Sequence, residues 1–194
     1  MCTGLCPGLN DVIAELFNTL YYNYGVSRVH GIRSGFRGFY DPRFMPWLDL
    51  TPDSVRGIDA IGGTVLGSSR GGFNLEAIMQ ACMNRGVNQL YIVGGDGTHR
   101  AADIIQQEAR RRRIKMTVAC VPKTIDNDIG IIDRSFGFNT ACGEARKAIQ
   151  SAVVEASCAP NGLGIVQLMG RHAGYISAHA TLASRQVDLC QEMH

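Results

Sequence analysis

The sequence predicts an α/β protein with a doubly wound, Rossmann-like, mainly parallel sheet and helices on both of its faces. Short, nearly continuous apolar runs alternate with amphipathic helical patterns along the chain, as in parallel sheets that are buried on both faces. Two of these runs lead directly into loops rich in glycine or aspartate. Because ligands of such sheets bind where loops leave the carboxyl ends of strands, we expect the chemistry there.

The apolar runs that we expect to be strands are Val26–Ile32, Thr64–Leu66, Gln89–Val93, Met116–Val121, Gly164–Leu168 and Gln186–Leu189. Polar capping residues mark the starts of the helices between them.

Asn10 is the expected N-cap of the first helix, whose apolar face is Val12, Ile13, Leu16, Phe17, Leu20, Tyr21 and Tyr24. Thr51-Pro52 is the start signal of a short second helix. Asn74 is the expected cap of a third, which ends at Gly86 and buries Leu75, Ile78, Met79, Cys82 and Met83. A fourth begins near Thr98 and ends in Arg110–Arg113, where we expect solvated cations that oppose the helix dipole.

Composition narrows the function classes. Of 194 residues, 45% are hydrophobic and 19% are charged, which excludes a disordered chain. The formal charge of +2 gives no support for a nucleic-acid partner. No apolar run approaches the roughly 18 residues of a membrane span, so no membrane association is expected. The seven cysteines include no CxxC pair and follow no signal peptide, which favours reduced thiols in a cytoplasmic protein without a thiolate metal site.

The loop Gly94-Gly95-Asp96-Gly97-Thr98 lies between an expected strand and an expected helix. Free backbone amides and the positive helix terminus at such a junction attract phosphate. The Asp96 carboxylate would repel that phosphate unless Mg²⁺ bridges the two, so the loop indicates a nucleotide with Mg²⁺. The alternative is a plain glycine turn with Asp96 as a structural cap.

The loop after the next strand is Lys123-Thr124-Ile125-Asp126-Asn127-Asp128. In an extended segment, alternate side chains share one face, which would bring Thr124, Asp126 and Asp128 together. Two converging carboxylates indicate a general base and a metal contact, with Lys123 as a nearby cation. The alternative is an Asx-turn in which Asn127 and Asp128 bond only nearby backbone.

Several other polar residues are candidates for binding or catalysis. Arg70 and Arg171 follow strands and are the better candidates for binding an anionic substrate. Ser69 lies in a G-x-S-x-G segment, which is typical of the serine hydrolase nucleophile, although Gly71-Gly72 prolongs the loop where a helix should begin. His172 and His179 have no ligand partner at helical spacing and are expected to be packing or surface residues.

Six segments that follow one another along the chain are Gly4–Asn10, Gly62–Arg70, Gly94–Thr98, Pro122–Asp128, Phe136–Ala141 and Met169–Arg171. In this order they resemble the 6-phosphofructokinase family, and the plant and trypanosome ATP-dependent branch in particular. The resemblance implies phosphoryl transfer from ATP to the 1-hydroxyl of fructose 6-phosphate in glycolysis, with Mg²⁺ as cofactor.

The resemblance also implies roles for single residues. Asp126 would be the general base, with Lys123 as the second catalytic residue and Asp96 as the Mg²⁺ ligand. ATP would be held by Gly4, Arg70, Gly94, Gly95, Asp96, Gly97 and Thr98. Fructose 6-phosphate would be contacted by Thr124, Asp126, Asp128, Met169, Gly170 and Arg171.

The expected identity of the phosphoryl donor depends on the residues at two positions. In the family, a glycine at the place of Gly97 accompanies ATP, whereas a lysine at the place of Lys123 resembles the pyrophosphate-dependent enzymes. The plant-like branch combines both and uses ATP, so ATP is the expected donor and pyrophosphate the alternative. The family further implies a homo-oligomer in the cytoplasm, with a plastid location left open.

The chain departs from the family pattern at both ends. The apolar strand expected before the first glycine loop is absent, and Thr3 stands in place of a loop glycine. The chain stops soon after Asp188-Leu189-Cys190, whereas the family continues into a second domain that supplies most sugar-phosphate contacts. We therefore expect residues 1–194 to form the nucleotide-binding domain, and a catalytically deficient nucleotide-binding fragment is a further alternative.

Overall fold

The computed structural model describes residues 1–171 and 174–185. The chain divides into two compact units, the first from Met1 to Lys123 and the second from Thr124 onward.

A parallel sheet organises the first unit. Strand β3 (Gln89–Gly94) pairs with β4 (Thr117–Pro122), with Leu90 opposite Val118. Residues 1–3 lie along the other edge of β3, where Val93 donates its N–H to the Met1 carbonyl at 2.9 Å and accepts from the Thr3 N–H at 2.9 Å. The two strands that the sequence predicts here are confirmed, and a short piece of a third accompanies them.

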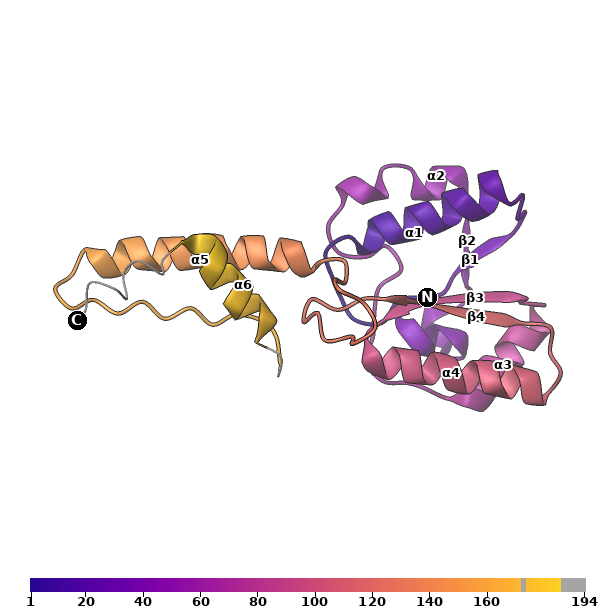
Figure 1. The fold of residues 1–194 in the computed structure, drawn as a ribbon. Helices are drawn as coiled ribbons and strands as arrows, with labels where there is room; N and C mark the ends of the chain where they lie inside the picture. Colours follow the sequence, from indigo (N-terminus) through magenta and orange to yellow (C-terminus); the bar gives the residue numbers. More distant parts are fainter. Residues whose placement is uncertain (172–173, 186–194) are drawn as a thin grey trace. The chain divides into compact units, whose positions relative to one another are not determined.

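Helices cover both faces of this sheet (Figure 1), as predicted: α1 (Leu9–Asn18) lies on one side and α3 (Leu75–Asn84) and α4 (Asp96–Arg111) on the other. The β3 side chains of Leu90 and Ile92 are buried in one core with Ile78, Met79 and Ile105 from the two helices. This confirms the α/β fold class.

Helix α3 begins and ends where the sequence predicts. The Asn74 side chain accepts the Ala77 N–H at 3.1 Å, and Gly86 follows the last turn with φ of +64°, a conformation that glycine adopts at little cost. The expected burial of Met83 is wrong: its side chain lies on the outer side of the helix and is 39% exposed.

Helix α1 starts differently from the prediction. Gly8, with φ of +84°, precedes its first residue, so Asn10 lies inside the first turn rather than capping it. The buried Asn10 amide donates to the Ile61 carbonyl at 2.8 Å and accepts the Val65 N–H at 2.9 Å. Asn10 therefore links α1 to the loop around residues 61–65 through two hydrogen bonds.

The apolar face of α1 is shorter than predicted. Ile13 and Phe17 are buried, but a π-helical segment over Thr19–Asn23 changes the residue spacing, and Tyr21 and Tyr24 are exposed. The periodicity of an ordinary helix no longer applies after Asn18.

A second, antiparallel sheet consists of β1 (Val29–Gly31) and β2 (Leu48–Leu50). β1 falls inside the predicted strand but is shorter. The short helix α2 (Pro52–Val55) begins at Thr51, as predicted, with a capping box to Ser54. The expected strand Thr64–Leu66 is wrong: the Gly67 N–H bonds to the Thr64 carbonyl at 3.1 Å, which closes a turn.

Ion pairs link the C-terminal end of α4 to Glu108, one turn earlier in the same helix, and to α3. Glu108 accepts from Arg111 and Arg112, and Arg112 also bonds Glu76 of α3. These hydrogen bonds lower the pKa of Glu108 to about 2. The arginine run is therefore a helix end, as expected, although Arg112 is only partly solvated.

In the second unit, α5 (Phe138–Ser157) packs on α6 (Tyr175–Ser184) through Phe138, Ala145, Ile176 and Ala180. His179 is exposed and its ring lies edge-on to that of Phe138, with centroids 5.1 Å apart, in agreement with the expected packing or surface role. The expected strand Gly164–Leu168 is wrong, because no described segment pairs with it and a strand requires a neighbour. His172 and the expected strand Gln186–Leu189 lie outside the described residues.

Across residues 1–171 and 174–185, no helix is long and apolar enough to cross a membrane. Six of the seven cysteines fall in these ranges, and all six are free thiols.

Candidate functional site

The glycine loop turns the end of β3 into the start of α4. Gly95 is the residue before the helix, and its carbonyl accepts the N–H groups of Thr98 at 2.9 Å and His99 at 3.1 Å. The N–H groups of Asp96 and Gly97 have no partner within the described part of the chain. Together with the helix dipole, these two donors form an anion-accepting terminus.

Position 94 requires glycine, because any side chain there would clash with two threonines. A Cβ atom there would lie 2.3 Å from Thr3 Oγ1 and 2.5 Å from Thr98 Cβ. The two threonine hydroxyls hydrogen-bond each other at 2.6 Å, which ties the segment of Gly4 to the first turn of α4. Thr3, which stands where the family pattern has a glycine, therefore makes a specific hydrogen bond to Thr98.

Lys123 brings a cation to the same edge of the sheet. Its N–H donates to the Gly94 carbonyl at 2.9 Å, and its side chain is buried. A Cβ atom on Gly4, which has φ of +71°, would lie 2.9 Å from Lys123 Nζ. Burial raises the pKa of the Cys2 and Cys6 thiols, and the Lys123 charge opposes this rise. Gly4, Gly94 and Lys123 are thus assembled as neighbours.

Asp96 and Gly97 face solvent. The Asp96 side chain is 58% exposed and pairs with Arg100 one turn on, at 3.0 Å. An added Cβ on Gly97 would meet no atom within 4 Å. Because Mg²⁺ in proteins is commonly held by one or two carboxylates together with phosphate oxygens and water, a single accessible carboxylate beside free amides fits that ion.

Arg70 lies exposed in the loop that precedes α3. Among the described residues, its side chain makes no hydrogen bond or ion pair with the glycine loop. The neighbouring Ser69 does approach the start of the chain at Gly35, where a Cβ atom would lie 2.8 Å from Ser69 Oγ and 3.3 Å from the Cys2 carbonyl oxygen. The serine hydrolase interpretation fails at this loop. No helix follows Ser69 before Leu75, and its hydroxyl donates to the Ser34 carbonyl at 2.6 Å.

The aspartate loop is a turn and not the extended segment that we expect from the sequence. Asn127 has φ of +53°, and its side chain donates to the Asp133 carbonyl at 3.0 Å and accepts the Ser135 N–H at 2.8 Å. The Ser135 hydroxyl donates to the Thr124 carbonyl. The Asn127 side chain therefore bonds backbone, as the alternative supposed, but at residues 133 and 135 and not two residues on as in an Asx-turn. Asp128 departs from that alternative, because it pairs with Arg171.

The carboxylates nevertheless converge, as the sequence suggests, because Arg171 holds both. Its Nε donates to Asp126 Oδ2 at 3.0 Å and its Nη2 to Asp128 Oδ2 at 3.3 Å. Asp126 is buried and its N–H also bonds Thr124 Oγ1 at 3.1 Å. We expected a metal or a proton to offset the repulsion of this pair; in the structure the guanidinium does so.

Gly170 lies close to Asp126, whereas Met169 is exposed. A Cβ on Gly170, which has φ of +119°, would lie 3.9 Å from Asp126 Oδ1. Met169 is 75% exposed, and no contact with the carboxylates is described for it. Of the expected sugar-phosphate residues, Thr124, Asp126, Asp128, Gly170 and Arg171 are thus brought together in the second unit.

Sequence reasoning missed three residues that shape these loops. The sequence shows that Thr3 departs from the family pattern. Its hydrogen bond to Thr98 joins residues 95 positions apart, and a sequence pattern cannot predict it. Ser135 bonds a residue eleven positions earlier. Arg100 could have been found, because an Asp and an Arg four residues apart on a helix commonly pair.

The fold and the two loops define a class of protein: a parallel α/β protein with an anion-accepting helix terminus after one strand and a carboxylate cluster after the next. The chain belongs to the phosphofructokinase family, whose pattern matches residues 1–191.

Individual relatives agree with this assignment. The chain is 54% identical over 189 residues to ATP-dependent 6-phosphofructokinase 7 and 56% identical over 189 residues to ATP-dependent 6-phosphofructokinase 1, both from Arabidopsis thaliana. In each case the match covers 97% of this chain but only 38% and 39% of the relative's own length. A crystal structure of pyrophosphate-dependent phosphofructokinase from Nitrosospira multiformis superposes with a TM-score of 0.84 at 21% identity, over 95% of this chain and 48% of that one.

Proposed function

We propose that this chain supplies the donor site and the general base for phosphoryl transfer from ATP to the 1-hydroxyl of fructose 6-phosphate, which yields fructose 1,6-bisphosphate. The observation that supports the donor site most directly is the start of α4. There, two N–H groups without a described partner, an exposed Asp96 and an open space at Gly97 adjoin one another.

In this proposal the phosphates of ATP bind the amides of Asp96 and Gly97, and Lys123 adds charge beside Gly4. Asp96 would hold Mg²⁺, which when bound neutralises charge on the phosphate oxygens. Gly95, Gly94 and Thr98 keep the loop in place, and Arg70 reaches the nucleotide from its exposed loop. Gly97 leaves room for a nucleotide, so ATP is the proposed donor and pyrophosphate the alternative.

On the acceptor side, Asp126 takes the proton of the sugar 1-hydroxyl as the hydroxyl oxygen attacks the terminal phosphorus of ATP, and the bond from that phosphorus to the oxygen of the leaving ADP breaks. Thr124, Asp128, Met169, Gly170 and Arg171 hold fructose 6-phosphate. Phosphoryl transfer depends mainly on positioning and on charge neutralisation, which such residues provide. Full-length proteins of this kind are proposed to be cytoplasmic homo-oligomers.

A calorimetric titration of the chain with MgATP and with magnesium pyrophosphate tests the donor site. Asp96→Asn should weaken MgATP binding by about tenfold, the effect of losing one charge-assisted contact. Asp103→Asn is the matched control, because Asp103 lies on the same helix and, among the described residues, its side chain bonds only Gln107. Equal affinities of the two variants would contradict the proposed site.

A coupled assay for fructose 1,6-bisphosphate, run with either donor, tests the chemistry. Asp126→Asn should lower turnover by roughly 10² to 10⁴, as expected for loss of a general base, and should leave MgATP affinity within about twofold. MgATP binding without any turnover would favour the alternative of a catalytically deficient fragment.

A further inference from the structure

A group of cations surrounds the C-terminal end of α4, at the opposite end of that helix from the glycine loop (Figure 1). We call this group the basic turn; it consists of Arg110, Arg111, Arg112, Arg113 and Lys115. The 16 residues of α4 separate it from Asp96 by about 24 Å at the usual rise per residue. A ligand of the basic turn would therefore not occupy the proposed donor site.

Three members of the basic turn have no anionic partner in the described part of the chain. Arg110, Arg113 and Lys115 are exposed, and none of them forms an ion pair with a described residue. The other two members pair with Glu108 and Glu76. Five cations thus face two carboxylates, which leaves a local positive charge on a chain whose formal charge is only +2.

Arg113 occupies a backbone position that does not favour arginine. Its N–H bonds to the Arg110 carbonyl at 3.0 Å, and the Ile114 N–H bonds to the Ala109 carbonyl at 2.9 Å. These are the two hydrogen bonds of a Schellman motif. Arg113 stands at the left-handed position of this motif, with φ of +55°, where glycine is the usual residue because a Cβ atom is strained there. Arginine is therefore present against the preference of the backbone.

The helix dipole explains only part of this charge. Arg110 and Arg111 lie in the last turn of α4, where cations oppose the negative end of the dipole. Arg113 lies beyond that turn, and three arginines already precede it there. Residues that proteins keep in a strained backbone conformation cluster at binding sites. The conformation of Arg113 thus points to a ligand for its side chain.

The ion pairs of the basic turn show which anion it binds. Arg112 donates from Nη1 to Glu76 Oε1 at 3.0 Å and from Nη2 to the other carboxylate oxygen. Arg111 donates from Nε and Nη2 to the two oxygens of Glu108, at 2.7 and 2.6 Å. Both are bidentate pairs, the geometry in which a guanidinium matches a carboxylate. The first pair also joins two elements, since Glu76 belongs to α3.

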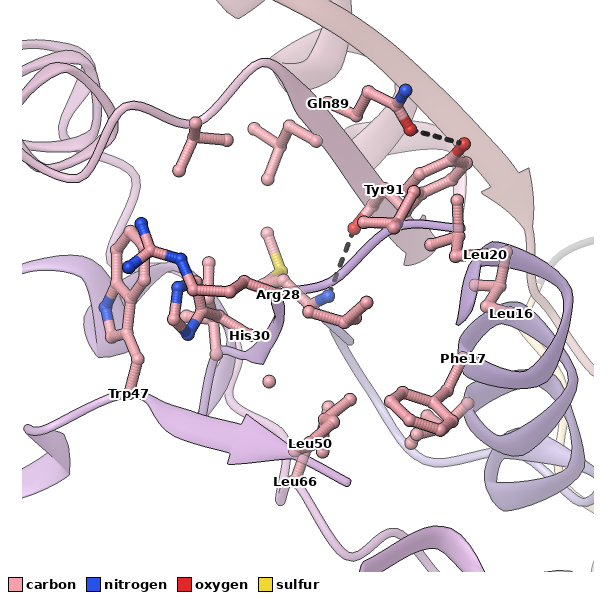
Figure 2. Close-up of a pocket in the computed structure, with 18 of the residues that line it drawn as sticks. Leu16, Phe17, Leu20, Arg28, His30, Trp47, Leu50, Leu66, Gln89 and Tyr91 are labelled. Carbon is pink, nitrogen blue, oxygen red and sulfur yellow. Dashed lines mark hydrogen bonds between the residues drawn. The ribbon is translucent and has the colours of Figure 1, made fainter. Parts of the chain in front are cut away.

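The basic turn lies on an open surface. The first unit has a cavity of about 320 Å³ whose walls include Leu16, Phe17 and Trp47 (Figure 2), and none of the described residues that line it belongs to the basic turn. One exposed ion pair contributes little to binding, because water and salt screen it. Several carboxylates on one chain bind more strongly, since every contact after the first is intramolecular. An open basic surface therefore suits an extended ligand better than a small one.

We propose that the basic turn is a docking site for an acidic peptide segment of a partner protein, rich in glutamate or aspartate. The carboxylates of the segment pair with the guanidinium groups of Arg110 and Arg113 and with the ammonium group of Lys115. The bidentate carboxylate pairs that the turn already makes with Glu108 and Glu76 favour such a segment over the phosphates of a nucleic acid.

The test is a fluorescence anisotropy titration of the chain with a fluorescein-labelled peptide of five Glu-Ser repeats. The matching peptide of Gln-Ser repeats is the control for the dye and the peptide backbone. The acidic peptide should bind at low salt and be released at high salt, because salt screens interactions between exposed charges. The Gln-Ser peptide should not bind.

Arg113→Gly separates binding from stability. It removes the charge and places the preferred residue at the left-handed position, so peptide affinity should fall by about threefold while the urea midpoint of unfolding stays equal or rises. Combination with Arg110→Gln should lower the affinity by about tenfold. Arg146→Gln is the matched control for Arg113→Gly, because Arg146 is an exposed cation on α5 and its loss changes the net charge equally.

Four results would overturn the proposal. The first is no binding of the acidic peptide, or equal affinities of the double variant and Arg146→Gln. The second is a labelled single-stranded DNA decamer that binds more tightly than the peptide and loses affinity in the double variant, which would make the turn a nucleic-acid site. The third is release of the peptide by MgATP, which would place it at the start of α4. The fourth is a lower urea midpoint for Arg113→Gly, which would mean that arginine is kept there for stability.

Discussion

The loop Gly94–Thr98 of the first unit and the loop Thr124–Asp128 of the second are held by opposite means. In the first, the loop conformation depends on glycines, which have no side chain. Gly94 leaves room for Thr3 and Thr98, and Gly97 faces open space. In the second, side chains make the shape through Asn127, Ser135 and Arg171. The first loop is therefore ready to accept an anion, whereas the carboxylates of the second already have a cation bound.

This difference has a chemical meaning for the proposed reaction. A phosphate group can approach the start of α4 without displacing a backbone contact. An anionic sugar phosphate that binds Arg171 must compete with Asp126 and Asp128 for the same guanidinium. Binding at the acceptor side would then also release Asp126 to act as a base.

The largest effect is expected at Gly94. Gly94→Ala places a Cβ within 2.5 Å of both threonines, so the free energy of unfolding should fall by about 1–3 kcal/mol, as in other overpacked sites. Gly97→Ala is the matched control within the same loop. It meets open space inside a helix and should be neutral or stabilising by up to about 1 kcal/mol. Urea denaturation of both variants checks this, and similar destabilisation would remove the steric explanation.

The second loop should respond to the loss of side-chain bonds. Asn127→Ala removes the bonds to Asp133 and Ser135 and leaves a left-handed backbone without its asparagine, which should cost about 1–2 kcal/mol in unfolding free energy. Asn127→Gly loses the same bonds but relieves the backbone, so it should cost less. If Asn127→Gly is the more damaging of the two in thermal unfolding, backbone conformation does not contribute.

The glycine loop has one side-chain tie of its own. A double-mutant cycle with Thr3→Ala and Thr98→Ala should give a coupling energy of about 0.5–1.5 kcal/mol for their hydroxyl bond. A coupling near zero in denaturation measurements would mean that the loop is held by backbone and packing alone, which would make the contrast with the second loop sharper still.

The smallest effect concerns the far end of α4. Because the pKa of Glu108 is lowered to about 2, its ion pairs stabilise the fold fully above the ordinary carboxyl pKa. That contribution is lost as the pH falls from about 5 toward 2. The melting temperature of Glu108→Gln should thus lie below that of the original chain at pH 7 and converge with it near pH 2. A constant difference across this range would contradict the assignment.

Much of the fold could be predicted where a local signal agreed with packing. β3, β4 and α3 have continuous apolar runs or clear caps, and their positions are correct. Thr64–Leu66 and Gly164–Leu168 have the same β-branched composition but no neighbouring strand among the described residues. Pairing is a property of distant segments, so composition alone could not separate these cases.

The candidate site was predictable in its residues but less so in its contacts. The glycine loop lies where the strand-to-helix junction predicts it. The aspartate loop brings its carboxylates together, yet through Arg171, 45 positions after Asp126, and around an asparagine in a left-handed conformation. Contacts across such separations depend on how the chain folds back, which neither spacing nor residue type encodes.

Deamidation of the Asn10 side chain would change how α1 is held in the first unit. Hydrolysis of that amide to a carboxylate would keep the oxygen that accepts from Val65 and lose the nitrogen that donates to Ile61. It would also place a negative charge at a buried position facing a carbonyl. A protein that had undergone this deamidation should therefore hold the loop around residues 61–65 less firmly against α1.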